Sequence, residues 1–305
     1  MTVSSTRGSD NKSGQAMETA SRVELALEAA LARAEGPGAP PRLAAAMRHA
    51  IFPGGGRVRP KLLLAVAGAN GDPAPTLSDA AAAALEMLHC ASLVHDDMPV
   101  FDDAPTRRGR PSVHAAFDAP TALLAGDALI VAAFETVARA APVDPAASAA
   151  LSLVIAKAVG MPRGITAGQG WESEPAIDLA EYHRAKTGAL FVAAATGGAI
   201  AAGRDPGPWR ALGEKLGEAY QVADDLADAF ASEQDIGKPC RQDAAHARPN
   251  AVAALGAAGA VAKLEGLIEA AAAAIPPCPG AGALADLVRL QAKRLAPKSL
   301  AAHVA

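Results

Sequence analysis

Aromatic residues and cysteines are scarce in this sequence, and neither sign of charge dominates. Only two Trp, two Tyr and six Phe occur among 305 residues. The three cysteines, Cys90, Cys240 and Cys278, form no C-x-x-C pair and no even set. This pattern excludes a disulfide framework and a thiolate metal site, and it is typical of a protein in a reducing, cytoplasmic compartment.

Charge and the lengths of the apolar runs exclude further classes. Lys and Arg number 28 against 32 Asp and Glu, a net charge of -4, and no run of basic residues occurs, so no nucleic-acid partner is expected. No window reaches the ~18 uninterrupted apolar residues of a transmembrane segment. Residues 1–22 are polar, lack the apolar centre of a signal peptide and are expected to form a disordered tail.

The apolar residues that remain are mostly alanine, the best helix former, and they recur at three- and four-residue intervals. This pattern predicts helices at 23–35, 41–51, 59–69, 77–98, 120–140, 145–160, 178–202, 208–232, 250–275 and 281–295. Short turns rich in Pro and Gly separate them, and none is long enough for an interdomain linker. We therefore predict an all-α fold, a single large helical bundle spanning residues 23–305.

The predicted helix 77–98 is apolar on nearly every side, as expected at the centre of a bundle, and it ends in the acidic sequence HDDMPVFDD. Two carboxylates ~5 Å apart repel by about 3 kcal/mol at an effective dielectric near 20, and a divalent cation would relieve this cost. Pro99 cannot continue the helix, so the chain should turn and bring Asp102 back towards Asp96 and Asp97. Taken alone, the cluster could equally be a solvated acidic loop.

A second acidic cluster, QVADDLAD, lies inside a predicted apolar helix. Asp224 and Asp228 are four residues apart on one face, and Asp225 lies about 100° away. An exposed polar face is the simpler interpretation, although the flanking residues are apolar. Two Asp-rich helices facing each other across one cavity could instead hold several Mg²⁺ ions, with phosphate oxygens completing the coordination.

Cationic side chains occur where a ligand that carries phosphate would need them. They are Arg57 and Arg59 in the turn GGGRVRP, Arg107 and Arg108 after the first cluster, Lys186 beside Thr187, and Lys238 after the second. Arginine suits bidentate phosphate contacts and lysine supplies a point charge. Each alone is typical of a protein surface, but together with the acidic clusters they indicate a ligand that carries phosphate.

These motifs resemble those of the trans-prenyltransferases, the polyprenyl diphosphate synthase family, over roughly residues 40–260. The matching segments are GGxRxRP at 54–60, HxxSLVHDDMPVFDDAPTRRG at 89–109, AGD at 125–127, GQ at 168–169, KTG at 186–188, YQVADDLAD at 220–228 and GKPCRQD at 237–243. The resemblance is strongest to bacterial geranylgeranyl and farnesyl diphosphate synthases. It implies helices around a deep apolar cavity, and a homodimer.

The resemblance also implies roles for individual residues. The Mg²⁺ ligands would be Asp96, Asp102 and Asp224, supported by Asp97, Asp225 and Asp228, for about three Mg²⁺ per site with substrate bound, with Mn²⁺ as a substitute. The allylic diphosphate would contact Arg107, Lys186, Thr187, Gln221 and Lys238. Isopentenyl diphosphate would contact Arg59, His89 and Arg108, with Arg57 a further candidate.

Three positions depart from the family pattern. Gly56 stands where a lysine is common, Pro239 replaces a threonine, and Gln242 replaces a second lysine. Two cations expected beside the diphosphates are therefore missing, and Arg57 or Arg241 could compensate.

The implied reaction is an Mg²⁺-dependent head-to-tail condensation of isopentenyl diphosphate with an allylic diphosphate (dimethylallyl, geranyl or farnesyl). Ionisation of the allylic C–O bond would be driven electrostatically, with no nucleophilic residue, and the departing diphosphate would take the proton.

Product length should depend on residues one and two turns before Asp96, because residues three to five apart share a helix face. Ala91 and Ser92 are small, whereas bacterial farnesyl synthases carry an aromatic ring at the first of these positions. Met87, with Leu88, is expected to close the cavity about one turn deeper, ~5.4 Å. These residues predict geranylgeranyl diphosphate, C20, as the product.

Alternatives from other classes remain open at this stage. A farnesyl diphosphate (C15) synthase needs only a shallower cavity. A class I terpene cyclase or a head-to-head synthase also pairs Asp-rich helices, but the second cluster is DDLAD and the Gly-rich Arg turn is present. A catalytically weak regulatory subunit of a prenyl synthase would account for Gly56 and Gln242.

Overall fold

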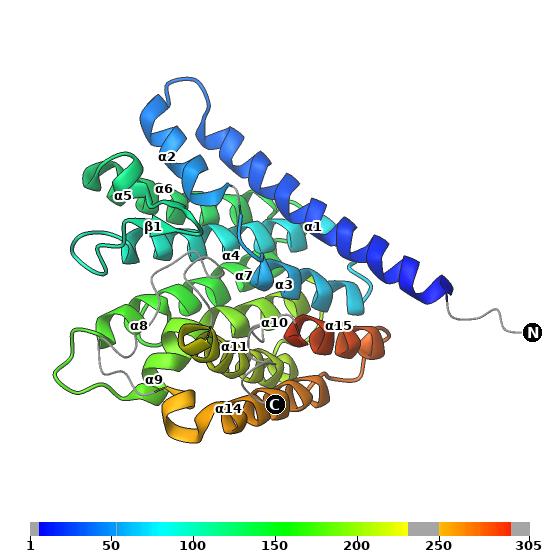
Figure 1. The fold of residues 1–305 in the computed structure, drawn as a ribbon. Coiled ribbons are helices and arrows are strands. Elements are labelled where there is room, and N and C mark those ends of the chain that lie inside the picture. The colour runs from blue at the N-terminus through cyan, green and yellow to red at the C-terminus, as the bar shows by residue number, and fades with distance from the viewer. Residues whose placement is uncertain (1–5, 53, 231–249, 294–305) are drawn as a thin grey trace, which may run out of the picture.

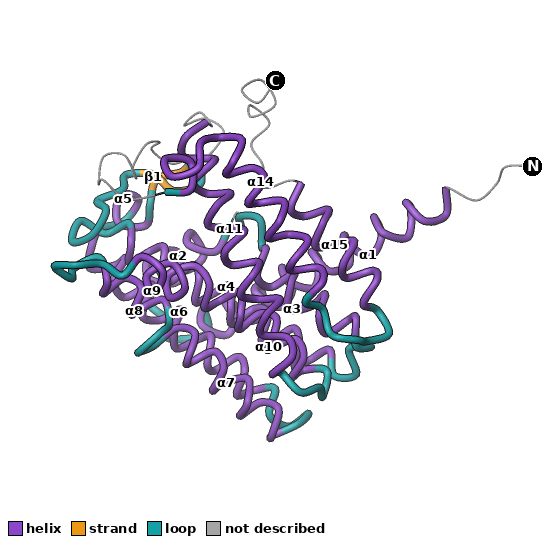
Figure 2. Tube along the Cα trace, turned by 90° about the horizontal axis from the view of Figure 1, so that it is seen from below, coloured by secondary structure: helices purple, strands orange, loops and turns teal. Residues whose placement is uncertain are grey.

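The computed structural model describes residues 6–52, 54–230 and 250–293, and most of them are helical (Figures 1 and 2). The longer helices are α1 (Thr6–Ala34), α2 (Pro41–Ile51), α3 (Val58–Ala69), α4 (Pro75–Asp96), α6 (Ala119–Arg139), α7 (Pro145–Val159), α10 (Ala189–Ala201), α11 (Arg210–Phe230), α14 (Ala251–Ala273) and α15 (Ala281–Lys293). Shorter ones are α5 (Val113–Ala116), α8 (Ile165–Trp171), α9 (Leu179–His183), the π-helical turn η1 (Arg184–Gly188) and the 3₁₀ turn η2 (Gly207–Trp209). The predicted all-α bundle is confirmed.

Helix α4 lies in the middle of the bundle and packs against α1, α2, α3, α6, α7 and α10 (Figure 1). Its residues 80–88 are all buried, and the first five of them are alanines. Small side chains let neighbouring helices approach closely, which explains how one helix can be enclosed on so many sides. The predicted central position of 77–98 is therefore correct.

Local sequence fixes where the helices begin. Asp118, Asp144 and Asn250 each accept a hydrogen bond from a backbone N–H in the first turn of α6, α7 and α14. Proline occupies the first positions of α6 and α7, where its missing N–H leaves no hydrogen bond unmade. These caps account for the close agreement between predicted and observed starts.

Three features differ from the sequence-based expectations. Helix α1 begins at Thr6 rather than at residue 23, since no proline interrupts residues 6–34. Helices α5 and α8 were not predicted, because four and seven residues are too few to show a helical period. A two-stranded antiparallel ladder, β1 (Thr106–Arg107) with β2 (Arg110–Pro111), also forms where no strand was expected.

Among the helices that the structure describes, α4, α6 and α14 are long and apolar enough to cross a membrane by length and composition alone. This differs from the prediction of no such segment, which required an uninterrupted apolar run. In α4, 78% of the apolar window is buried inside the bundle, against 44% in α6 and 17% in α14. Packing in the core therefore accounts for the apolar character of α4.

Candidate active site

The site is a cavity of about 800 Å³ bounded by α4, the turn before α3, and helices α6, α8, α10 and α11. One end is polar, with Asp96 and Asp224 from the two predicted acidic clusters. The other charged and polar lining residues include Arg57, Arg59, Glu86, His89, Ser92, His95, Arg107, Arg108, Thr166, Gln169, Lys186, Thr187 and Gln221. Two segments more than a hundred residues apart in sequence thus meet at one cavity, as predicted.

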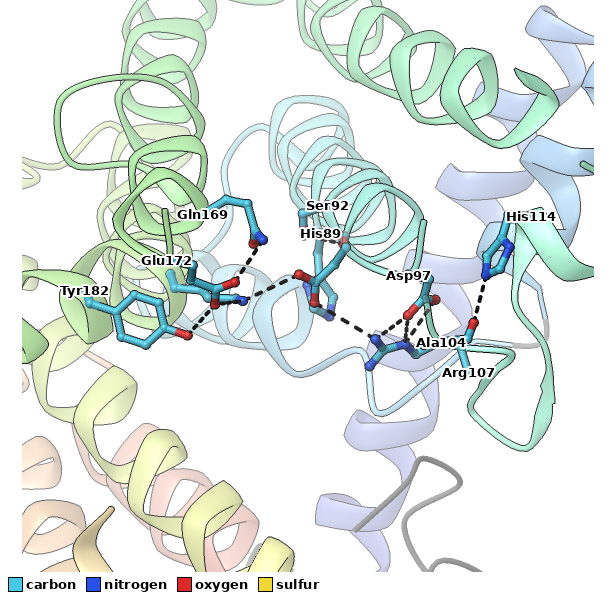
Figure 3. Close-up of polar contacts among 11 residues, drawn as sticks. His89, Ser92, Asp97, Ala104, Arg107, His114, Gln169, Glu172 and Tyr182 are labelled. Carbon is cyan, nitrogen blue, oxygen red and sulfur yellow. Dashed lines mark hydrogen bonds and ion pairs between the residues drawn. The ribbon is translucent and has the colours of Figure 1, made fainter. Parts of the chain in front are cut away.

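The first acidic cluster turns back on itself after α4. The Asp102 N–H donates to the Asp96 carbonyl (3.0 Å), and the Ala104 N–H donates to the Asp97 carbonyl (3.1 Å). His114 contacts the Ala104 carbonyl at 3.0 Å (Figure 3). The predicted turn at Pro99 is therefore present, and it returns Asp102 to the end of α4.

The two aspartates at the end of α4 have different surroundings. Asp96 lines the cavity, whereas the Asp97 side chain is 3% exposed and accepts hydrogen bonds from the Arg107 guanidinium (Figure 3). Burial raises the pKa of Asp97, although Arg107 and its positive charge oppose the rise. Asp96 is therefore the carboxylate of this pair that lines the cavity, and Asp97 orients Arg107 beside it.

Lys186 reaches the same carboxylate from the other side of the cavity. Its Nζ lies 3.5 Å from Asp96 Oδ1 and forms an ion pair with Glu172. Glu172 also accepts hydrogen bonds from the Tyr182 hydroxyl (2.6 Å) and from Gln169 Nε2 (3.0 Å), as Figure 3 shows. Burial opposes the charged form of Lys186, but Asp96, Tyr182 and Glu172 outweigh it and raise its pKa.

Backbone geometry places Lys186 and Thr187 at the cavity. Both lie in the π-helical turn η1, a geometry found often at functional sites. A Cβ on Gly168 would stand 2.5 Å from the Lys186 backbone nitrogen, so only glycine lets α8 pack here. The Thr187 hydroxyl donates to Gln221 Oε1 (2.9 Å).

The second acidic cluster divides in the same way as the first. Asp224 is exposed at the cavity, while Asp225 is buried and accepts from Gln221 Nε2 (3.0 Å) and from the Ala251 N–H (2.7 Å). Asp228 is half-buried one turn further along α11. Asp225 therefore fixes Gln221 and the start of α14, whereas Asp224 lines the cavity.

A second cationic group lies next to the turn before α3. Arg59 Nη1 is 3.4 Å from His89 Nε2, and its guanidinium stacks on Phe191 (4.8 Å) and Tyr220 (5.5 Å). Arg59 Nε is buried and has no hydrogen-bond partner. Burial and the charges of Arg59 and Arg108 hold the pKa of His89 well below its usual range. A buried guanidinium with an unused donor fits an anionic ligand.

Arg108 approaches this group from the hairpin. Arg108 and Gly109 both have positive φ (55° and 72°), as the two central residues of a tight two-residue hairpin turn require. An added Cβ on Gly55 would lie 2.9 Å from the Arg108 guanidinium, so Arg108 rests directly on the glycine turn.

Arg57 lines the cavity, as the prediction of a diphosphate contact requires, but its guanidinium also has partners within the chain. Its side chain is 3% exposed, and the guanidinium donates to Glu24, Glu86 and the Ile51 carbonyl. The sequence did not show these partners, and a contact between Arg57 and diphosphate stays a prediction.

Of the residues predicted to set chain length, some line the cavity and one does not. Ala91 and Ser92 line it, as does Leu88, whereas Met87 is completely buried in the core and lies outside the lining. One residue along a helix is a rotation of about 100°, which separates Leu88 from Met87. Apolar side chains of other helices complete the wall, namely Leu123, Ile130, Val159, Ile165 and Leu190.

The predicted residues Lys238, Pro239, Arg241 and Gln242 lie outside the described residues. Among the residues that the structure does describe, no three His, Cys, Asp or Glu side chains are close enough to hold a metal ion by themselves. Mg²⁺ is usually held by one or two carboxylates, with water and substrate phosphate filling the other positions. Asp96 and Asp224 at the mouth of a cation-lined cavity fit that mode.

Glu172 is the residue of the site that the sequence analysis missed. It ends the segment GQGWE, three residues after Gln169 of the GQ pair that matched the family pattern. On a helix this spacing puts Glu172 on the same face as Gln169, which already pointed to the site.

Comparison with known proteins decides the family. Residues 40–273 match the polyprenyl synthetase family. The chain belongs to this family.

Its relatives agree with this assignment. The chain is 55% identical to the geranylgeranyl diphosphate synthase of Cereibacter sphaeroides, over 93% of this chain and 98% of that one. It is 39% identical to the farnesyl diphosphate synthase of Geobacillus stearothermophilus, over 82% and 86%. A crystal structure of an FPP/GFPP synthase from Zymomonas mobilis is 31% identical, covers 92% of this chain and 99% of its own, and has a TM-score of 0.75. The chain is therefore a prenyltransferase with the isoprenoid synthase fold.

Proposed function

We propose that this protein condenses isopentenyl diphosphate with an allylic diphosphate to make geranylgeranyl diphosphate. The observation that carries the proposal is a single apolar cavity with two cationic groups at its polar end, one beside Asp96 and Asp224 and one around Arg59. Two such groups suit two diphosphates bound side by side. The similarity to geranylgeranyl diphosphate synthases supports the same product.

The allylic diphosphate belongs with the acidic clusters. Asp96 and Asp224 would hold Mg²⁺, and Lys186, Arg107 and Thr187 would bind the diphosphate oxygens. When bound, Mg²⁺ supplies positive charge that stabilises the departing diphosphate. Asp97 and Glu172 keep the two cationic side chains oriented towards this place.

Isopentenyl diphosphate belongs with the second group. Arg59 and Arg108 would bind its phosphates, and His89, neutral because of its lowered pKa, would donate or accept one hydrogen bond. Its double bond then lies towards the apolar part of the cavity, where it attacks the allylic carbon as the C–O bond breaks. This addition leaves a carbocation on the isopentenyl unit, from which the apolar wall excludes water. The adjacent carbon then loses a proton to the released diphosphate, and the C–H electron pair forms the new double bond.

The depth of the cavity supports a C20 product. Ala91 and Ser92 leave room next to Asp96, and Leu88 lies about one turn deeper. One turn, about 5.4 Å, is close to one isoprene unit, so the chain can grow one unit past C15 before it meets Leu88.

We also propose a cytoplasmic homodimer. Helices α6 and α7 expose Leu124 (54%), Val131 (68%) and Leu153 (55%), which are large apolar side chains on neighbouring helices. A face of this kind is stabilised by burial against a second copy. The cysteine usage supports a cytoplasmic location.

The test is incubation with isopentenyl and dimethylallyl diphosphates, with Mg²⁺ or with excess EDTA. The proposal predicts prenyl diphosphates with Mg²⁺ and none with EDTA. Hydrocarbon products would indicate a cyclase. Absence of any product with either divalent ion, Mg²⁺ or Mn²⁺, would indicate a regulatory subunit and contradict the proposal.

A further inference from the structure

Arg57 and Glu86 form a buried ion pair, with side chains 3% and 2% exposed, in the wall of the cavity beside Arg59 and His89. The Arg57 Nε donates to Glu24 Oε1 of α1 (2.8 Å) and its Nη1 to Glu86 Oε1 of α4 (2.8 Å). Its Nη2 donates to the Ile51 carbonyl at the end of α2 (3.0 Å). One guanidinium at the start of α3 therefore joins four helices.

The backbone at Arg57 is unusual as well. Arg57 has φ 50° and ψ 38°, a left-handed conformation that few residues other than glycine adopt, and it is the residue before the first turn of α3. A Cβ on Gly54 would overlap the Arg57 guanidinium, so the glycine turn folds directly over this side chain. The contacts with the two glutamates hold the turn in a shape that it would not otherwise prefer.

The Arg57–Glu86 pair lies about one helical turn of α4 from His89, so it affects how Arg59 meets His89. Glu86 precedes His89 by three residues on α4. On the other side of the contact, at the start of α3, Arg57 precedes Arg59 by two residues. The Arg57–Glu86 pair therefore sets the register in which Arg59 meets His89 at 3.4 Å. The side chains of Arg57 and Glu86 are 3% and 2% exposed, so no solvent competes for this pair.

We propose that Arg57 and Glu86 are positioning residues for isopentenyl diphosphate: they orient the 54–59 turn so that Arg59 and His89 converge on its diphosphate. This rests on the proposed function of the second cationic group. Arg57 and Glu86 pair with each other, with Glu24 and with the Ile51 carbonyl, whereas Asp96 pairs with Lys186 and Arg107, so we expect the effect to be confined to one substrate.

The test uses Arg57→Lys and Glu86→Gln. Lysine keeps the charge but lacks the fork that spans both glutamates and the Ile51 carbonyl, and glutamine keeps the shape of Glu86 but not its charge. Wild-type turnover is measured first. We expect each variant to raise the KM for isopentenyl diphosphate about tenfold or more, with kcat and the KM for the allylic substrate within about twofold.

The control is Arg48→Lys. Arg48 of α2 also forms ion pairs with two glutamates, Glu28 of α1 and Glu35 just after this helix, but its side chain is 39% exposed. We expect unchanged kinetics. Calorimetric titration with isopentenyl diphosphate alone should show the same loss of affinity in the two test variants, and this readout does not depend on turnover.

A wild-type protein that does not condense the substrates would contradict the proposed function. A wild type that is active, with folded Arg57→Lys and Glu86→Gln variants of unchanged KM and affinity for isopentenyl diphosphate, would overturn the positioning role. Equal effects on both substrates, or loss of folding in both variants, would also overturn it, because the pair would then serve stability alone.

Discussion

Individual charges in the cavity are balanced by other side chains of the same chain. The Asp96 carboxylate has Lys186 Nζ 3.5 Å from one oxygen and Arg107 Nη2 4.0 Å from the other. These two cations lower the repulsion that a cluster of aspartates would otherwise produce. The acidic clusters can therefore fold without a metal ion, and the same cations lie ready for a diphosphate.

This balance leads to the first prediction, for Asp96→Ala and Asp224→Ala. Each removes a carboxylate that faces the cavity, so turnover should fall below detection, while the helical circular dichroism spectrum stays close to that of the wild type. Lys186 keeps Glu172 as a partner in the first variant, so no buried charge is left unpaired. Glu265→Ala on the exposed face of α14 is the control and should stay active. Substantial activity in both aspartate variants would refute the metal assignment.

A second prediction concerns Gly56, which lines the cavity next to Arg59. A Cβ here would meet only the Val58 Cγ2 methyl, at 3.2 Å, so a lysine needs only a slight shift. Gly56→Lys should lower the KM for isopentenyl diphosphate, since a charged phosphate contact is worth about 1.5 to 3 kcal/mol, a tenfold effect or more. The KM for the allylic substrate should not change.

Steady-state kinetics with each substrate varied in turn measures this. An unchanged KM for isopentenyl diphosphate would show that the group lacks no cation. Lys61, whose Nζ is 2.9 Å from the Gly56 carbonyl, would then be the side chain to examine.

Site residues could be predicted from sequence where the charged side chain belongs to a recognisable motif. They could not be predicted where the position of the side chain depends on a contact with a distant segment. Asp96, Asp224, Lys186 and Arg59 line the cavity as expected. The positions of Arg57 and Glu172 depend on partners from distant segments, Glu24 and Lys186 respectively. Such pairings are set by the packing of helices, which the local sequence does not specify.

At the scale of the helices, the cavity wall is built from one face of α4 against α6, α8 and α10. Ala91 and Leu88 line the cavity, whereas Met87 is buried in the core. The wall therefore predicts different outcomes for neighbouring substitutions on the same helix.

Ala91→Phe should shift the main product to C15, because the ring fills the space below the first isoprene units. Leu88→Ala should lengthen the product. Met87→Ala, the matched control, should leave product length unchanged and lower the free energy of unfolding by about 2 to 5 kcal/mol, since it empties a filled core position. Chromatography of dephosphorylated products and thermal unfolding check these outcomes. A Met87→Ala enzyme that makes longer chains would place the floor at Met87 instead.

The long helices were predictable because their apolar period persists for ten residues or more and because Pro, Asp and Asn mark their starts. The hairpin at 106–111 and helix α5 were not, because four to six residues carry no measurable period. The hairpin matters to the site, since it delivers Arg107 and Arg108.

For the whole molecule, the exposed apolar side chains of α6 and α7 predict association. Val131→Glu places a charge in the centre of that face and should convert a dimer into a monomer in light scattering coupled to size-exclusion chromatography. Leu25→Glu is the control, because Leu25 is equally exposed (69%) but lies on α1. A wild type that runs as a monomer, or a Val131→Glu variant that stays dimeric, would contradict this interface.

The central claim is that one cavity joins two diphosphate substrates into a C20 chain. It is tested most directly by supplying labelled isopentenyl diphosphate with dimethylallyl, geranyl or farnesyl diphosphate and Mg²⁺, and by determining product length by mass spectrometry. The account predicts geranylgeranyl diphosphate as the main end product from all three allylic substrates. Accumulation of C15 with no elongation of farnesyl diphosphate would contradict it.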